Sequence, residues 1–148
     1  MKAFTVAAVQ IAPVQGPLTA ESVKGNLAKA ADWVTRAVDA TGAELVVLPE
    51  SVTTGFTPGT GPEQLWDLVS EVPGPVIEPL QETARRLGIH LVVGTYERGP
   101  ERGVVYNASV LLGRDGEPAG VYRKTHPFCT EMRSRGGWVT PGDEVCVV

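Results

Sequence analysis

The chain has 148 residues, of which 43% are hydrophobic and 20% are charged, and its formal net charge is −4. This length suits one domain with one core, and the composition is that of a globular chain rather than a disordered one. The apolar runs are too short to cross a bilayer and no basic stripe is present, so neither a membrane nor a nucleic acid is expected as a partner.

Strand and helix patterns alternate in the first half of the chain. Residues 3–9 form a compact apolar run typical of a strand, and a loop bearing Pro and Gly follows. Thr19 is placed to cap a long helix that ends at Gly42, with apolar residues at helical spacing between them. Residues 44–48 predict a buried strand, and residues 51–62 predict a loop rich in Thr, Gly and Pro.

Two more helices and a third strand follow. Residues 63–70 predict a short helix, and a longer one is expected to begin at Pro75 and end at Gly88. Residues 89–94 then form a third apolar strand. This βαβα order implies parallel strands with helices on one face of the sheet.

A hairpin is predicted near the end of the chain. Strands at 104–112 and 117–122 are joined by Gly-Arg-Asp-Gly at 113–116, which is a strong turn signal. The hairpin makes the expected sheet mixed. Two substantial helices barely cover one face, so the fold class is α/β with a mixed sheet whose other face needs a cover from elsewhere.

The first candidate catalytic residue is Glu50, which follows Pro49 at the carboxyl end of the strand at 44–48. Ligands of open α/β sheets gather at this edge, where a carboxylate could serve as a general base. The alternative is a solvated charge at a strand end.

Lys124 follows the second strand of the hairpin in the same way. If the two strand ends converge, Lys124 and Glu50 share one pocket, and we expect their polar atoms to approach within about 4 Å. A lysine in that position could stabilise an oxyanion that forms on an attacked carbonyl. The alternative is a solvated lysine in a basic Arg123-Lys124 pair.

Other polar residues are weaker candidates. Glu131 lies in a loop beyond Lys124 and could orient the lysine or a substrate amine, or be a surface glutamate. Cys129 is not assigned as a nucleophile, because a free cysteine more often packs than reacts. Cys146 alternates with valines, which predicts a core strand position. Asn107-Ala108-Ser109 matches a glycosylation acceptor, which we interpret as a chance match within a strand.

The two cysteines and the N-terminal residues predict the compartment. Two cysteines without a C-x-x-C motif are too few for a disulfide framework. The N-terminal residues carry one charge and no long apolar segment of the kind found in signal peptides. A reducing, cytoplasmic location is therefore expected.

Seven short motifs occur in a fixed order along nearly the whole chain. They are Ala7-Ala8-Val9-Gln10, Leu48-Pro49-Glu50, Thr54-Gly55-Phe56, Tyr106-Asn107-Ala108-Ser109, Gly113-Arg114-Asp115-Gly116, Tyr122-Arg123-Lys124-Thr125-His126 and Pro141-Gly142-Asp143. Each motif is weak alone, but the set in this order resembles the carbon–nitrogen hydrolase (nitrilase) superfamily, and its amidases in particular.

The resemblance implies an αββα sandwich, dimers that bury helices across their interface, and a Glu-Lys-Cys site. It places the general base at Glu50, the catalytic lysine at Lys124 and an accessory glutamate at Glu131. The substrate would be a small amide or N-carbamoyl amine, cleaved to an acid and ammonia or an amine. No metal or organic cofactor is required.

In this family the nucleophilic cysteine lies on a strand-to-helix elbow after the strand that carries Pro141-Gly142-Asp143. That strand is the last one in the sequence. We therefore expect residues 1–148 to be the N-terminal part of a single domain, with the elbow and the second half of the sandwich absent, and to be inactive alone. The expected partner is either the missing half or another copy of the chain.

Two other interpretations remain open. The chain could be a non-catalytic half-sandwich that serves in binding or assembly. It could also be a standalone α/β ligand-binding domain of another family, although the order of the motifs argues against this.

Overall fold

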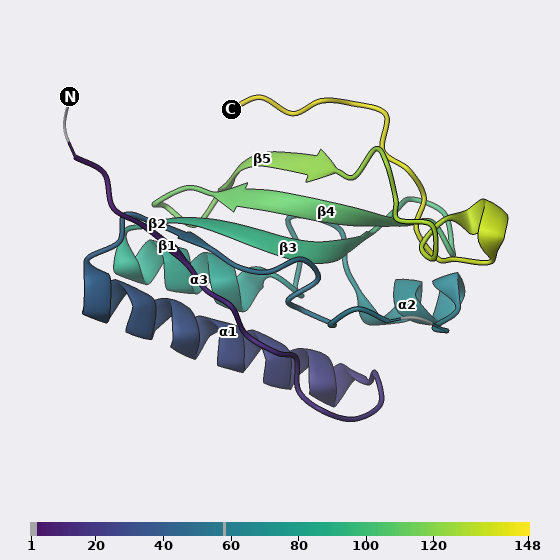
Figure 1. The fold of residues 1–148 in the computed structure, drawn as a ribbon, viewed down its shortest axis with the longest axis horizontal. Coiled ribbons are helices and arrows are strands. Elements are labelled where there is room, and N and C mark those ends of the chain that lie inside the picture. Colours follow the sequence, from purple (N-terminus) through teal and green to yellow (C-terminus); the bar gives the residue numbers. More distant parts are fainter. Residues whose placement is uncertain (1–2, 58) are drawn as a thin grey trace.

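The computed structural model describes residues 3–57 and 59–148. These residues contain one five-stranded sheet, three α-helices and a short 3-10 helix (Figure 1). The strands are β1 (Val6–Ala8), β2 (Leu45–Val47), β3 (His90–Arg98), β4 (Val105–Leu112) and β5 (Pro118–Arg123). The helices are α1 (Ala20–Thr41), α2 (Pro62–Leu68), α3 (Glu78–Leu87) and η1 (Arg133–Arg135).

The strands lie in the order β1-β2-β3-β4-β5. The pairs β1–β2 and β2–β3 are parallel, whereas the pairs β3–β4 and β4–β5 are antiparallel. The predicted mixed sheet is therefore confirmed. The hairpin is confirmed as well, because the Gly113 N–H donates to the Glu117 carbonyl at 2.8 Å and Gly116 takes a left-handed φ of 81°.

The long helix α1 begins and ends where the sequence predicted. The Thr19 hydroxyl accepts the Ser22 N–H at 3.2 Å, the Ser22 hydroxyl accepts the Thr19 N–H at 2.9 Å, and Gly42 ends the helix at φ 65°. α3 also ends at its predicted glycine, Gly88, but it begins at Glu78 rather than at Pro75. Residues 75–77 form a turn instead, in which the Ile77 N–H donates to the Gly74 carbonyl at 3.1 Å.

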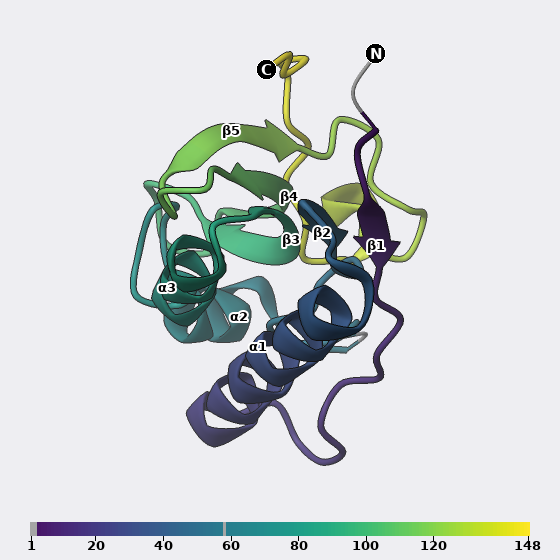
Figure 2. The ribbon, with the colours of Figure 1, turned by 90° about the vertical axis from the view of Figure 1, so that its left-hand side faces the viewer.

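α1 and α3 lie side by side on one face of the sheet, as Figures 1 and 2 show. Their apolar faces and the inner side chains of β2, β3 and β4 form the main core. A second, smaller cluster lies between α2 and the far ends of β3 and β4. None of the helices within the described residues is long and apolar enough to span a membrane.

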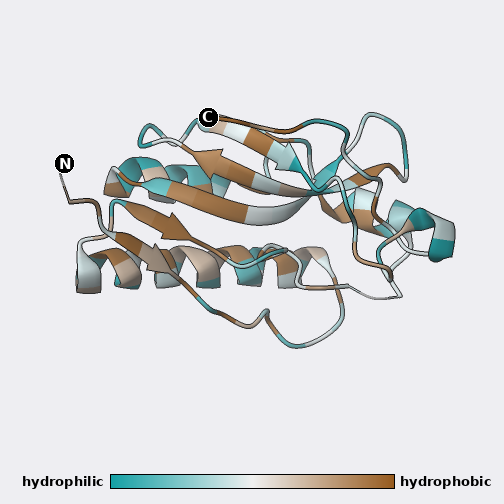
Figure 3. Ribbon diagram, turned by 45° about the horizontal axis from the view of Figure 1, so that its top comes forward, coloured by the Kyte–Doolittle hydropathy of each residue, from teal (hydrophilic) through white to brown (hydrophobic). Residues whose placement is uncertain are grey.

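The opposite face of the sheet is covered much less. The C-terminal segment passes beside β5 without joining the sheet (Figure 1), and the hydropathy colouring shows apolar residues along the strands (Figure 3). In that segment Val145 and Val147 are 84% and 88% exposed. The core strand position predicted for Cys146 is wrong. Cys146 is exposed, because its segment lies over Gly120 and pairs with no strand within residues 3–57 and 59–148.

β3 runs four residues beyond the predicted end at Gly94. The charged residues Glu97 and Arg98 are typical of a loop, which is why the sequence predicted an earlier end of the strand. This boundary is wrong, because Glu97 is buried in the strand and only 3% exposed. The Arg123 guanidinium donates to both carboxylate oxygens of Glu97, at 2.7 and 2.8 Å, and stacks over the Tyr106 ring. This pairing compensates the buried charge and allows the strand to continue.

Candidate active site

Glu50 is positioned by a close approach of two backbone segments. After β2 the chain crosses over Gly94 of β3, where an added β-carbon would stand 2.5 Å from the Pro49 carbonyl oxygen and 2.7 Å from the Glu50 α-carbon. The Val52 N–H donates to the Gly94 carbonyl at 2.8 Å, and Ser51 takes a left-handed φ of 53°. Only glycine fits at position 94, and the resulting bend leaves the Glu50 side chain 60% exposed above the sheet.

Lys124 follows β5 directly and is held through its backbone. Its N–H donates to the Asn107 carbonyl of β4 at 2.8 Å, and its carbonyl accepts the Gly142 N–H at 3.0 Å. Gly142 packs on the Arg123 backbone, which leaves no room for a β-carbon there. These contacts fix the direction of the lysine side chain, which is 27% exposed.

Glu131 lies in the turn before η1 and is fully buried, at 0% exposure. The Phe128 N–H donates to its Oε2 at 2.9 Å, and its backbone carbonyl accepts the Val139 N–H at 2.9 Å. Gly137 packs directly against its backbone. The alternative that the sequence left open, in which Glu131 is a surface residue, is therefore excluded.

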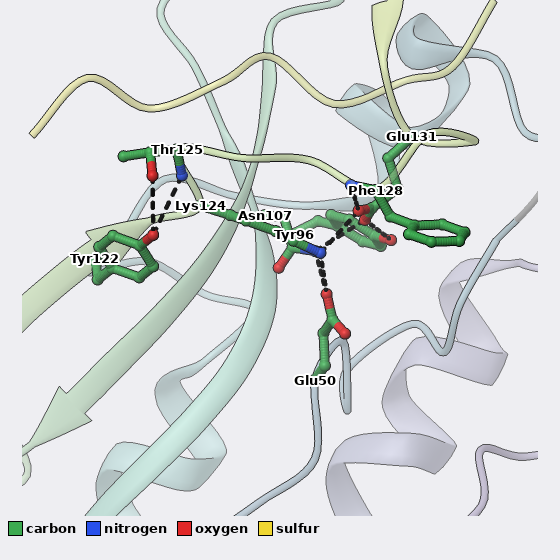
Figure 4. A network of polar contacts seen from close by, with 8 residues as sticks. All are labelled: Glu50, Tyr96, Asn107, Tyr122, Lys124, Thr125, Phe128 and Glu131. Atoms are coloured by element: carbon green, nitrogen blue, oxygen red, sulfur yellow. Dashed lines mark hydrogen bonds and ion pairs between the residues drawn. The ribbon is translucent and has the colours of Figure 1, made fainter. Parts of the chain in front are cut away.

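The three predicted site residues meet at one point (Figure 4). Lys124 Nζ lies 2.8 Å from Glu50 Oε1 and 2.8 Å from Glu131 Oε2. The predicted approach of Glu50 and Lys124 within about 4 Å is therefore confirmed. One ammonium group bridges two carboxylates, of which one is exposed and the other is buried.

The charges in this cluster stabilise one another. Burial alone would raise the pKa of the Glu131 carboxyl, but hydrogen bonds from Lys124, the Phe128 N–H and Asn107 outweigh burial and lower it. Burial alone would lower the pKa of Lys124, but its hydrogen bonds to Glu131 and Glu50 raise it. At neutral pH Glu131 is therefore a carboxylate and Lys124 an ammonium.

Two residues in the cluster were missed by the sequence analysis. Asn107 on β4 donates from Nδ2 to Glu50 Oε1 at 2.7 Å and to Glu131 Oε1 at 2.9 Å. Tyr96 on β3 places its hydroxyl 3.5 Å from Glu131 Oε1, and burial raises the pKa of this phenol, which keeps it protonated. A polar amide within an apolar strand was the signal that could have identified Asn107. Instead, Asn107 was interpreted only through its match to a glycosylation acceptor. At 5% exposure, Asn107 is too buried for that modification.

An open hollow of about 400 Å³ adjoins the Glu50–Lys124 pair. Its floor is the sheet face formed by β2, β3 and β4, and its lining includes Val47, Val92 and Tyr122. A small apolar molecule with one polar group would fit against this face with the polar group at the ammonium.

Neither cysteine is part of the cluster. Cys129 and Cys146 are both free and exposed, and the His126 ring nitrogen Nδ1 is hydrogen-bonded to the Thr125 hydroxyl at 2.9 Å. Within residues 3–57 and 59–148, no three His, Cys, Asp or Glu side chains are grouped as metal ligands would be.

Comparison with known proteins agrees with this α/β fold. Residues 5–143 match the sequence model of the family described as Carbon-nitrogen hydrolase, so the protein belongs to the carbon–nitrogen hydrolase (nitrilase) superfamily. The resemblance inferred from the motifs is confirmed.

In each of the individual relatives, the match covers less than half of the relative's own length. A nitrilase of Pyrococcus abyssi is 38% identical over 91 residues, which are 61% of this chain and 33% of that protein. The human omega-amidase is 28% identical over 149 residues, 97% of this chain and 49% of that protein. The crystal structure of a carbon–nitrogen hydrolase from Helicobacter pylori superposes with a TM-score of 0.74 at 22% identity, over 95% of this chain and 45% of that one. The chain thus spans less than half the length of these relatives.

Proposed function

We propose that this chain contributes the base and the cation of an amide-hydrolysing site. The substrate class is a small amide or N-carbamoyl amine, and the products are an acid and ammonia or an amine. The observation that carries the proposal is the ammonium of Lys124 at 2.8 Å from both Glu50 and Glu131. Similarity to an omega-amidase supports the same class of reaction.

In the proposed mechanism, Glu50 accepts the proton of a cysteine thiol, and the thiolate attacks the carbonyl carbon of the amide. Lys124 donates hydrogen bonds to the oxyanion of the tetrahedral intermediate. The C–N bond then breaks, the amine leaves with the proton held by Glu50, and a thioester remains. Glu50 next takes a proton from water, the hydroxide attacks the thioester, and the thiol recovers the proton as the acid leaves.

Glu131 acts on Lys124 rather than on the substrate in this scheme. It is buried and charged, and its Oε2 accepts from the ammonium at 2.8 Å, so it fixes the position of Nζ and keeps the lysine protonated. Lys124 is then a stable electrostatic donor, and proton transfer is left to Glu50, which is exposed to the hollow.

The nucleophile is proposed to come from outside residues 1–148. We propose that these residues are the N-terminal part of a single domain, and that a second half supplies the cysteine elbow and covers the open sheet face to complete an αββα sandwich. The exposed Val145 and Val147, 84% and 88% accessible, would be buried by that half. A cytoplasmic location and assembly into homo-oligomers belong to the same proposal.

The test is to read the coding sequence beyond codon 148 and to assay two polypeptides, the 148-residue chain and the longer one. The 148-residue chain should turn over neither simple amides nor N-carbamoyl amines. A longer polypeptide with a cysteine elbow should be active. Glu50→Gln should abolish that activity without unfolding the polypeptide. Activity that survives Glu50→Gln, or that is abolished by Cys129→Ala, would overturn the assignment.

The second candidate is a non-catalytic half-sandwich used in assembly. It is favoured by one observation: both cysteines of this chain, Cys129 and Cys146, are exposed and outside the charged cluster. A coding sequence that stops at codon 148, together with a partner protein that binds the open sheet face, would support this role over catalysis.

A further inference from the structure

Asn107 touches all three proposed site residues. Its side-chain amide donates to Glu50 Oε1 at 2.7 Å and to Glu131 Oε1 at 2.9 Å, and its backbone carbonyl accepts the Lys124 N–H at 2.8 Å. Figure 4 shows its amide nitrogen pointing towards the two carboxylates. Because both neighbours there are acceptors, the amide must present its NH₂ group and not its oxygen.

The position of Asn107 itself is fixed by the sheet. It lies in the middle of β4, paired with Tyr96 of β3, and is 5% exposed. Both amide protons are used, one for each carboxylate. A buried amide with both of its protons bonded holds its partners more rigidly than a flexible lysine can.

The two donors to Glu50 converge on the same oxygen. Lys124 Nζ and Asn107 Nδ2 both contact Oε1, at 2.8 and 2.7 Å. Among residues 3–57 and 59–148, no hydrogen bond is made to Oε2 of Glu50. The carboxylate is therefore held by one oxygen and presents the other outwards, which is the oxygen available to accept a proton.

We propose that Asn107 is a positioning residue: it holds Glu50 through Oε1 so that Oε2 serves as the base, and it fixes Lys124 and Glu131 in the same frame. This inference rests on the proposed function for the role of Glu50, but the geometry it requires exists without turnover. Asn107 remains neutral, so it separates two carboxylates without adding a charge that would compete with Lys124 for them.

The test begins with NMR of the 148-residue chain, which needs no activity. The two side-chain amide protons of Asn107 should resonate separately, and one of them should shift as the Glu131 carboxyl is protonated. Glu50→Ala should release the other proton and leave the first unchanged. If the chemical shifts of these amide protons changed neither with acid titration nor with Glu50→Ala, the inference would be overturned, whatever the reaction of the protein is.

The second arm uses Asn107→Leu, which keeps the size of the side chain and removes both donors. Its carboxyl titration should show the Glu131 pKa displaced upwards relative to the wild type, because a donor to the charged form is lost. Ser109→Ala, two residues along the same face of β4, is the matched control and should leave that titration unchanged. Should Asn107→Leu fail to fold, the wild-type and Glu50→Ala spectra still decide the matter.

The third arm applies to an active longer polypeptide. There Asn107→Leu should lower kcat about a hundredfold with little change in KM, because it disturbs orientation and not substrate binding. An unchanged kcat alongside the expected NMR shifts would overturn the positioning role. Inactivity of the wild-type longer polypeptide would instead overturn the proposed function, while the NMR arms would still test the placement.

Discussion

Replacing Lys124 by Met removes the cation between the two carboxylates and keeps most of the side-chain volume. The variant leaves Glu131 charged and fully buried, with Asn107 and the Phe128 N–H as its remaining close donors, each at 2.9 Å. Breaking a buried pair in this way costs about 3 to 5 kcal/mol. Since Glu131 keeps other donors, the lower end of that range applies to this pair.

The Glu50 side of the pair adds little to the total. Its side chain is 60% exposed, and an exposed ion pair contributes less than about 1 kcal/mol. We therefore expect Lys124→Met to lower the free energy of unfolding by about 3 kcal/mol. For a domain of this size that is a fall of roughly 10 °C in Tm, or of about 1 to 2 M in the urea midpoint.

Urea unfolding monitored by tryptophan fluorescence measures this cost, and Arg114→Met is the matched control. Arg114 contacts Glu44 at the same 2.8 Å, but the two side chains are 49% and 34% exposed. The control should cost less than about 1 kcal/mol. Equal losses in the two variants would refute the reasoning, because burial would then not determine the strength of the Lys124 pair.

The cost should also depend on pH. The pKa of Glu131 is lowered in the folded protein, so its stabilising contribution is present above the ordinary carboxyl pKa and is lost as the pH falls through the folded value. In Lys124→Met, protonation of Glu131 removes the uncompensated buried charge. The stability gap between wild type and variant should therefore narrow in acid, and a gap independent of pH would contradict this account.

Three further predictions address the surroundings of the site. Because the pKa of Lys124 is raised in the folded protein, the wild-type advantage over Lys124→Met should be full below the ordinary lysine pKa and should decline as the pH rises from there through the folded value, as urea unfolding at alkaline pH would reveal. Gly94→Ala should cost about 1 to 3 kcal/mol in urea unfolding, because its β-carbon would meet the Pro49 carbonyl at 2.5 Å. Gly61→Ala meets no described atom within 4 Å and loses only a helix-capping preference at the start of α2, so it should cost less, and equal effects would contradict the close approach. The 15.7 kDa chain should associate at micromolar concentration in sedimentation experiments, since exposed apolar residues such as Val145 need a cover, and a strictly monomeric species would argue against it.

Local signals in the sequence were sufficient for most of the elements. Thr19 and Gly42 bound α1 because capping depends on a few neighbouring residues, and the Gly-Arg-Asp-Gly turn at 113–116 defines its hairpin for the same reason. The sequence failed where a distant partner determined the outcome. Glu97 is buried in β3 beside Arg123, which neutralises its charge, and Cys146 is exposed because no strand among the described residues pairs with its segment.

For the candidate site, the sequence by itself determined the chemical groups and their place at strand ends. Pro49-Glu50 and Arg123-Lys124 each follow a strand, and motif order identified the superfamily. Only the tertiary structure decided that Glu50 and Lys124, 74 residues apart, lie 2.8 Å from each other, and that Asn107 joins them to a buried Glu131. The reason is physical: these contacts depend on the register of β4 against β3 and β5 and on the close crossing at Gly94, and pairings between distant strands leave no periodic signal in the sequence.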